Sequence, residues 1–98
     1  MPAYVVGLHQ IVDPAKFEEY KAKIVPMVAR YGGRYLTRGE NLKMPEGGRW
    51  TPERVVIIEF PDMAAINAWY TSPEYQPLIG LRKACQSEND VTFFMDGS

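Results

Sequence analysis

The stretch that decides the fold is RVVIIEF, residues 54–60. Its β-branched and aromatic residues predict a β-strand. Successive side chains of a strand point to opposite faces, so apolar side chains stand on both faces here, and the carboxylate of Glu59 stands among them. A strand of this kind is typical of a sheet that is covered on both sides. One face carries Val55, Ile57 and Glu59, and the other carries Val56, Ile58 and Phe60.

Three further segments predict strands around this one. AYVVGLHQI (residues 3–11) and GRYLTRG (33–39) precede it, and DVTFFMDG (90–97) follows it near the end of the chain. The first and last of these also alternate apolar residues on both faces. The segment NLKMPEGGRWTPE (41–53) has two prolines, two glycines and no periodicity, and predicts a long loop.

Two helices are predicted between the strands. The first lies in DPAKFEEYKAKIVPMVARYGG (13–33), where an N-cap aspartate and a first-turn proline precede apolar residues at spacings of three and four, and a diglycine follows. The second begins in DMAAINAWYT (62–71). Ser72 and Pro73 then interrupt it, and we expect them to restart it as a new N-cap and a first-turn proline.

The resulting order is βαββαβ, which predicts an α+β ferredoxin-like fold with a four-stranded antiparallel sheet and both helices on one face. The length of 98 residues predicts a single domain, residues 1–98. The sheet face without helices would expose an apolar area larger than a soluble monomer tolerates. We therefore expect a homodimer that buries this face, sheet against sheet.

Charge and composition exclude several classes of partner. The net charge is −1 and the charged residues are intermixed, so nothing predicts nucleic-acid or membrane binding. One His and one Cys, Cys85, leave little from which to build a disulfide or a metal site. No leader precedes Tyr4 and no apolar run is long enough to span a membrane, so a cytoplasmic location is expected.

The segments YGGRYLTRG, PERVVIIEFP and AWYTSPEYQ together resemble a bacterial family, domain of unknown function 1330, over nearly the whole chain. The resemblance implies the dimeric α/β barrel superfamily, in which two ferredoxin-like protomers join their sheets. It implies no established activity. The superfamily includes cofactor-free monooxygenases, haem-degrading oxygenases, isomerases and polyketide cyclases, whose ligands lie between the sheet and the helices.

The haem-degrading members have a Trp, a Ser a few residues later, and an iron-binding His ten positions after the Trp. Trp69 and Ser72 match this pattern, but Ile79 stands where the His would be. Isoleucine cannot bind iron, so we expect no haem and no other cofactor.

Several residues near the helix break are candidates for a ligand site. Trp69 and Tyr75 are either core residues or the walls of a pocket, because a buried indole N–H or phenol O–H needs a partner. Arg82 lies seven residues after Tyr75 on the same helical face, and a guanidinium there must pair, reach solvent or bind an anion. Its expected partner is Glu59, in a structural ion pair. Alternatively, Glu59 transfers protons while Arg82 or Arg38 binds a ligand carboxylate.

Two other residues complete the candidate set. His9 is the one side chain whose unperturbed pKa lies near neutrality, so it is either a general base or an ordinary packed residue. Trp50, in the long loop, either covers a pocket or contacts a second copy of the chain.

These residues support two classes of function. The first is a cofactor-free enzyme, isomerase-like or monooxygenase-like, that acts on an aromatic or unsaturated carboxylic acid. The second is a non-catalytic module that binds such a small organic acid or only assembles. The sequence names neither the ligand nor the reaction.

Overall fold

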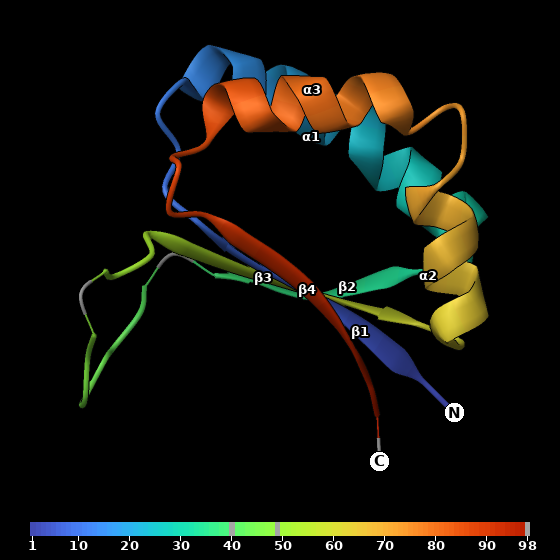
Figure 1. Ribbon diagram of the computed structural model, residues 1–98, viewed down its shortest axis with the longest axis horizontal. Coiled ribbons are helices and arrows are strands. Elements are labelled where there is room, and N and C mark those ends of the chain that lie inside the picture. The colour runs from blue at the N-terminus through green and yellow to red at the C-terminus, as the bar shows by residue number, and fades with distance from the viewer. Residues whose placement is uncertain (40, 49, 98) are drawn as a thin grey trace.

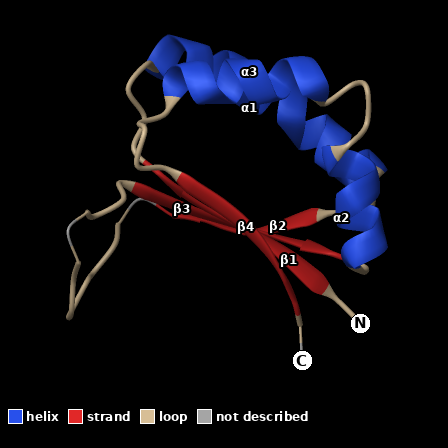
Figure 2. Ribbon diagram, viewed as in Figure 1, coloured by secondary structure: helices blue, strands red, loops and turns tan. Residues whose placement is uncertain are grey.

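The computed structural model describes residues 1–39, 41–48 and 50–97, and it shows a sheet covered by helices on one face (Figures 1 and 2). Its four antiparallel strands lie in the order β2-β3-β1-β4. The predicted α+β ferredoxin-like βαββαβ fold is confirmed, with the second helix divided in two. The elements are β1 (Ala3–His9), α1 (Pro14–Arg30), β2 (Arg34–Gly39), β3 (Arg54–Phe60), α2 (Met63–Tyr70), α3 (Gln76–Cys85) and β4 (Val91–Asp96).

The first helix, α1, begins and ends where the sequence predicted. The side chain of Asp13 accepts the backbone N–H of Lys16 at 3.1 Å, which satisfies one of the free donors at the helix start. At the other end Gly32 adopts φ 84°, a left-handed conformation that favours glycine. The buried face of α1 carries Ile24, Met27 and Val28.

The break between α2 and α3 is built around Ser72. Its hydroxyl donates to the carbonyl of Trp69 at 2.8 Å and accepts the N–H of Tyr75 at 3.3 Å. Ser72 therefore caps the connecting turn, whereas the helix α3 starts only at Gln76 and has Tyr75 at its N-cap position without a side-chain cap. The predicted restart of the helix is confirmed, but it lies a few residues later than expected.

The packed core lies at one end of the sheet, beneath this break. Phe60, Ile66 and Tyr75 have no exposed surface, and Trp69 is 2% exposed. The ring of Trp69 lies 5.5 Å from that of Phe60 and 4.5 Å from that of Tyr75, between centroids. These aromatic contacts hold the helix break against the sheet.

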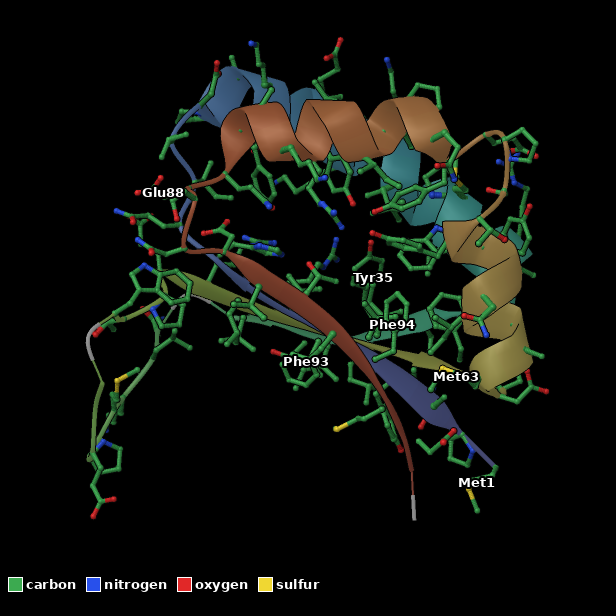
Figure 3. All side chains as sticks on the ribbon, in the orientation of Figure 1. Met1, Tyr35, Met63, Glu88, Phe93 and Phe94 are labelled. Carbon is green, nitrogen blue, oxygen red and sulfur yellow. The ribbon has the colours of Figure 1, made fainter. Side chains whose placement is uncertain are left out.

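The strand register separates two faces of different accessibility. Phe93 and Phe94 point to opposite sides of β4 (Figure 3). The face away from the helices, which we call the open face, keeps Phe93 41% and Met95 47% exposed. Its middle row runs Phe93, Val6 and Ile57 across three paired strands.

A bulge in β2 places Arg38 on the helix side of the sheet. Tyr35 pairs with Ile58, but the register then shifts, so that Arg38 pairs with Val56. Ile58 and Val56 both face the helices, and Arg38 therefore shares a face with Tyr35. Unbroken alternation along the strand would instead have put Arg38 on the same face as Arg34.

Two further observations concern the rest of the described chain. Residues 41–48 and 50–53 contain no helix or strand, as predicted for this loop. None of the helices in the described segments is both long and apolar enough to cross a membrane.

We predict opposite effects on stability for two glycine substitutions. A Cβ at Gly33 would lie 2.6 Å from Val28 Cγ1 and 2.9 Å from the Phe60 ring, so Gly33→Ala overpacks the core and should cost about 1–3 kcal/mol. Gly80 lies inside α3 with nothing within 4 Å of that position, so Gly80→Ala should stabilise by about 0.5–1 kcal/mol. Urea unfolding at one fixed protein concentration measures both. A Gly33→Ala variant as stable as the wild type would contradict the described packing.

Candidate functional site

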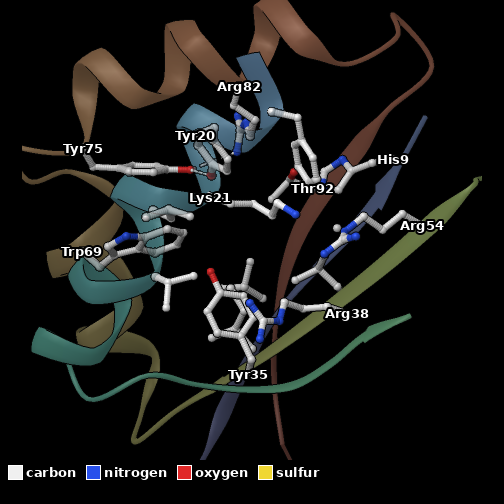
Figure 4. Close-up of a pocket in the computed structure, with 17 residues that line it drawn as sticks. His9, Tyr20, Lys21, Tyr35, Arg38, Arg54, Trp69, Tyr75, Arg82 and Thr92 are labelled. Carbon is white, nitrogen blue, oxygen red and sulfur yellow. Dashed lines mark hydrogen bonds between the residues drawn. The ribbon is translucent and has the colours of Figure 1, made fainter. Parts of the chain in front are cut away.

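A cavity lies between the helices and the covered face of the sheet (Figure 4). The volume of this cavity is about 60 Å³. Its walls come from α1, from Trp69 of α2, from Tyr75 in the break, and from Arg82 of α3. Trp69, Tyr75, Arg82, Arg38 and His9 were all singled out from the sequence, and the fold brings these five together around one space.

The floor of the cavity consists of neighbouring rows of the sheet. Thr92, Gly7, Val56 and Arg38 are aligned across the four strands. Gly7 contributes no side chain to this row, which leaves room for the ring of His9. The adjacent rows supply the other floor residues, namely Val5, Ile58 and Tyr35 on one side and His9 and Arg54 on the other.

Aromatic side chains form one end of the cavity. Trp69 and Tyr75 lie together there, and the Tyr75 hydroxyl lies 2.9 Å from the Tyr20 hydroxyl (Figure 4). Burial raises the pKa of Tyr75 and raises that of Tyr20 well above its ordinary value, so both phenols stay neutral near pH 7. The indole N–H of Trp69 is buried and has no hydrogen-bond acceptor in the structure.

Arg82 is a buried cation whose described partners are neutral. The residue is 8% exposed, and its Nη1 donates to the Tyr75 hydroxyl at 3.3 Å. Its Nε is buried without an acceptor, and no ion pair joins it to a carboxylate of the described residues. A guanidinium removed from water in this way favours an anionic ligand.

The predicted ion pair between Arg82 and Glu59 is wrong. Glu59 lies on the open face, where its Oε1 accepts from Arg34 Nε at 2.8 Å and its Oε2 accepts from the Tyr4 hydroxyl at 3.3 Å. The sheet separates this carboxylate from the cavity, which it does not line. The structure therefore does not bring Glu59 together with the other candidate residues.

His9 is oriented by a carboxylate that the sequence analysis did not identify. Its Nδ1 lies 3.3 Å from Asp90 Oδ2, and the Asp90 side chain is fully buried. The other oxygen of Asp90 accepts the backbone N–H of Gln10 at 2.9 Å and the hydroxyl of Ser87 at 2.6 Å. An ionised carboxylate only accepts hydrogen bonds, so Nδ1 carries the proton and Nε2 is left as an acceptor.

The free nitrogen of His9 occupies the space that Gly7 leaves. A Cβ on Gly7 would lie 2.4 Å from His9 Nε2, so only glycine accommodates the ring in this position. Burial lowers the pKa of His9, and the nearby Asp90 offsets part of this effect. The site thus holds a neutral imidazole beside the cavity.

Positive charge dominates the cavity lining. Lys21, Arg38, Arg54 and Arg82 line it, and no Asp or Glu is among the described residues that do so. Arg38 lies 4.8 Å from the ring centre of Tyr35, and Arg54 is only 7% exposed. Lys21 is partly neutralised by Glu18, whose carboxylate lies 2.9 Å away.

Sequence reasoning missed several of these residues for identifiable reasons. Tyr20 carried a signal, since it lies on the apolar stripe of α1, but nothing in the stripe showed that its hydroxyl meets Tyr75. Arg54 and Asp90 stand at strand ends, where charged residues are common, and two partners of Asp90, Gln10 and His9, lie 80 and 81 residues away in the chain. Trp50 is half-buried outside the cavity lining, so its predicted role at the pocket stays untested.

No group of three His, Cys, Asp or Glu residues that could hold a metal ion occurs in the described parts of the chain.

Fold and site together define a ferredoxin-like protein with a cation-lined cavity under its helices. The chain belongs to the family described as Domain of unknown function (DUF1330), whose pattern matches residues 2–96.

Solved structures of similar fold include a protein of unknown function from Rhodopseudomonas palustris (18% identity, TM-score 0.82), covering 99% of this chain and 82% of that one. A dimeric ferredoxin-like protein of unknown function from Jannaschia sp. CCS1 has 15% identity and a TM-score of 0.78, covering 99% and 100% of the two chains. SnoaB, a cofactor-independent oxygenase from Streptomyces nogalater, has 16% identity and a TM-score of 0.70, covering 99% and 93%. A comparison with curated proteins returned no match.

We predict that His9 makes stability depend on pH. The pKa of His9 is lower in the folded protein than its ordinary value of 6.5. The contribution of His9 to the free energy of unfolding is therefore fully present above pH 6.5, and it is lost as the pH falls through the pKa of the folded protein. The wild type should therefore lose stability relative to His9→Asn as pH falls from 7 to 5. Urea unfolding of both proteins across this range measures the difference. Parallel curves would show that the imidazole is not buried in its neutral form.

Proposed function

We propose that the cavity binds a small aromatic or unsaturated carboxylic acid and that the protein transforms it without a cofactor. The observation that carries the proposal is Arg82, a buried guanidinium whose Nε has no acceptor, in an apolar and aromatic-walled cavity that no described carboxylate lines. Cations held near one another in a low-dielectric site repel one another, and an anion relieves that repulsion. An acid with a planar apolar body matches both parts of the lining.

The geometry suggests how such a ligand would lie. Trp69 and Tyr75 form the packed end wall against which a planar ring would lie, and the half-buried Tyr35 presents an aromatic ring with which it can stack. The ligand carboxylate would accept from Arg82, whose Nε has no acceptor in the structure. The neutral hydroxyls of Tyr20 and Tyr75 add donors beside it.

His9 would supply the chemistry. Its neutral Nε2 would take a proton from a C–H or O–H group of the bound acid, and the electron pair would stay on the substrate as an enolate or phenolate. Asp90 would stabilise the resulting imidazolium, and the cations would stabilise the substrate anion. Returning the proton to another carbon completes an isomerisation.

The oxygenase version of the proposal starts from the same anion. The carbanionic carbon of an electron-rich enolate or phenolate can form a bond to O₂ directly. The resulting peroxide takes up the proton, and loss of water leaves a carbonyl, so the substrate itself reduces O₂ and no bound cofactor is required. SnoaB is described as a cofactor-independent oxygenase, and its similarity in fold supports this version without extending to particular residues.

The first test is binding. Benzoic, salicylic, cinnamic and cis,cis-muconic acids should raise the melting temperature of the wild type, and calorimetry should give a dissociation constant for the best of them. Arg82→Met should weaken binding about tenfold or more, because a hydrogen bond to a charged group contributes roughly 1.5–3 kcal/mol. Lys83→Met, an exposed change at the next position of α3, is the matched control and should bind normally.

The second part of this test is turnover of the acids that bind. His9→Asn should lower kcat by about 10²–10⁴ while changing the dissociation constant little, since general base catalysis contributes on this scale. Glu59→Gln should leave kcat unchanged, because this carboxylate is paired on the open face. Binding without product in the wild type would leave a non-catalytic binding module. Absence of binding by every acid would refute the proposal.

We also propose that the protein is a homodimer that buries the open face. This face exposes Phe93, Met95, Val91 and Leu36 by 41–47% each, and an apolar surface of this kind is typical of a protein interface. The Jannaschia protein of the same fold is described as dimeric. A sheet-to-sheet dimer would leave the cavity of each protomer on the far side of its sheet, so each site would be formed within one chain.

Phe93→Asp should convert the dimer to a monomer at micromolar concentration, because it places a charge in the middle row of the open face. Sedimentation velocity measures the change. Val12→Asp is the matched control, since Val12 is 58% exposed outside the sheet and should leave the dimer intact. A wild-type protein that sediments as a monomer would contradict the proposed interface.

A further inference from the structure

A second pocket lies beside the cavity and is larger. Its volume is about 290 Å³, and we call it the outer pocket. Residues before α1, the first turns of α1 and the start of β3 line it. Unlike the cavity, it includes two carboxylates, Glu18 and Glu53.

Three residues line both spaces, and their side chains contact one another. They are Phe17, Lys21 and Arg54. The ring centre of Phe17 lies 5.0 Å from the guanidinium carbon of Arg54 and 5.1 Å from Lys21 Nζ. The same ring stacks on Tyr20, a cavity residue, at 6.5 Å between centroids. Phe17 is thus held in place between the cavity and the outer pocket.

The position of Phe17 limits the length of the cavity. Trp69 and Tyr75 close one end of the cavity with fully packed rings. A longer ligand can therefore extend only toward the other end, where Lys21 and Arg54 lie (Figure 4). There the Phe17 ring and its two cation contacts separate the ligand from the outer pocket. The cavity alone is small, and joining it to the outer pocket would lengthen the accessible space.

We propose that Phe17 is a specificity-determining residue that restricts the cavity to single-ring acids, and that the outer pocket becomes a subsite for longer acids when this ring is removed. The inference rests on the proposed acid-binding function. Glu18 is paired with Lys21, but the second carboxylate of the outer pocket, Glu53, can accept a hydrogen bond from a distal amine or another donor.

The experiment compares benzoic acid, biphenyl-4-carboxylic acid and 4′-amino-biphenyl-4-carboxylic acid by calorimetry. The wild type should bind benzoic acid at least tenfold more tightly than either biphenyl acid. Phe17→Ala should gain at least tenfold for both biphenyl acids, with the larger gain for the amino form, and should change benzoic acid binding by less than about threefold.

Val25→Ala is the matched control. Val25 lines the cavity from the same helix but does not line the outer pocket, so this change enlarges the cavity without joining the two spaces. It should not admit the biphenyl acids. Phe17→Leu, a smaller change, should give an intermediate gain and replaces Phe17→Ala if that variant does not fold.

The outcomes separate this inference from the function on which it rests. If benzoic acid binds but neither Phe17 variant gains affinity for the biphenyl acids, the role of Phe17 is refuted while acid binding stands. A wild type that binds the biphenyl acids as tightly as benzoic acid also refutes it. If no acid binds the wild type, the proposed function fails and the inference fails with it.

Discussion

The alternation of side chains along the paired strands β1 and β3 is the constraint on which the rest of this structure depends. Val5, Gly7 and His9 face the helices, whereas Tyr4, Val6 and Leu8 face the other side. Both sets are largely apolar, so each face of the sheet needs cover. The three helices cover one face, and the other stays open in the single chain. The same alternation of side chains therefore accounts for the cavity on one face of the sheet and for the proposed interface on the other.

The cavity forms where the covered face is poorly filled. Toward Ala3 and Phe60 the space above the sheet is occupied by Trp69 and Ile66, and the packing is close. Toward Gly7 and Thr92 the floor residues are small, and the helices present long polar side chains instead. Burying the Arg82 guanidinium without an ion pair to a described carboxylate is costly for a structural core, and a site that binds anions is a physical reason to retain it. Catalytic and binding residues commonly carry a local cost of this kind.

The candidate residues differ in how far sequence reasoning could place them. Arg82 was predicted from local periodicity to lie on the same helical face as Tyr75, and Trp69 was predicted to lie near the same helix break, so local sequence was enough to group these three residues. Glu59 was assigned to the wrong partner, because both faces of β3 carry apolar residues and nothing in the segment shows which of them the helices cover. The face on which Arg38 lies could not be predicted, because a β-bulge leaves no reliable mark in a single sequence. Its register shift depends on pairing with β3.

The sequence alone determined the order of the elements, the cap of the first helix and the two apolar faces of the sheet, because these follow from local spacing and turn chemistry. It also contained His9 and the four cations without showing that they share one space. Only the tertiary structure decided that Asp90 meets His9, that Tyr20 meets Tyr75, and that Glu59 lies across the sheet from Arg82. The two contacts join residues more than 50 positions apart in the chain. All three arrangements depend on strand register and helix packing, which no local pattern encodes.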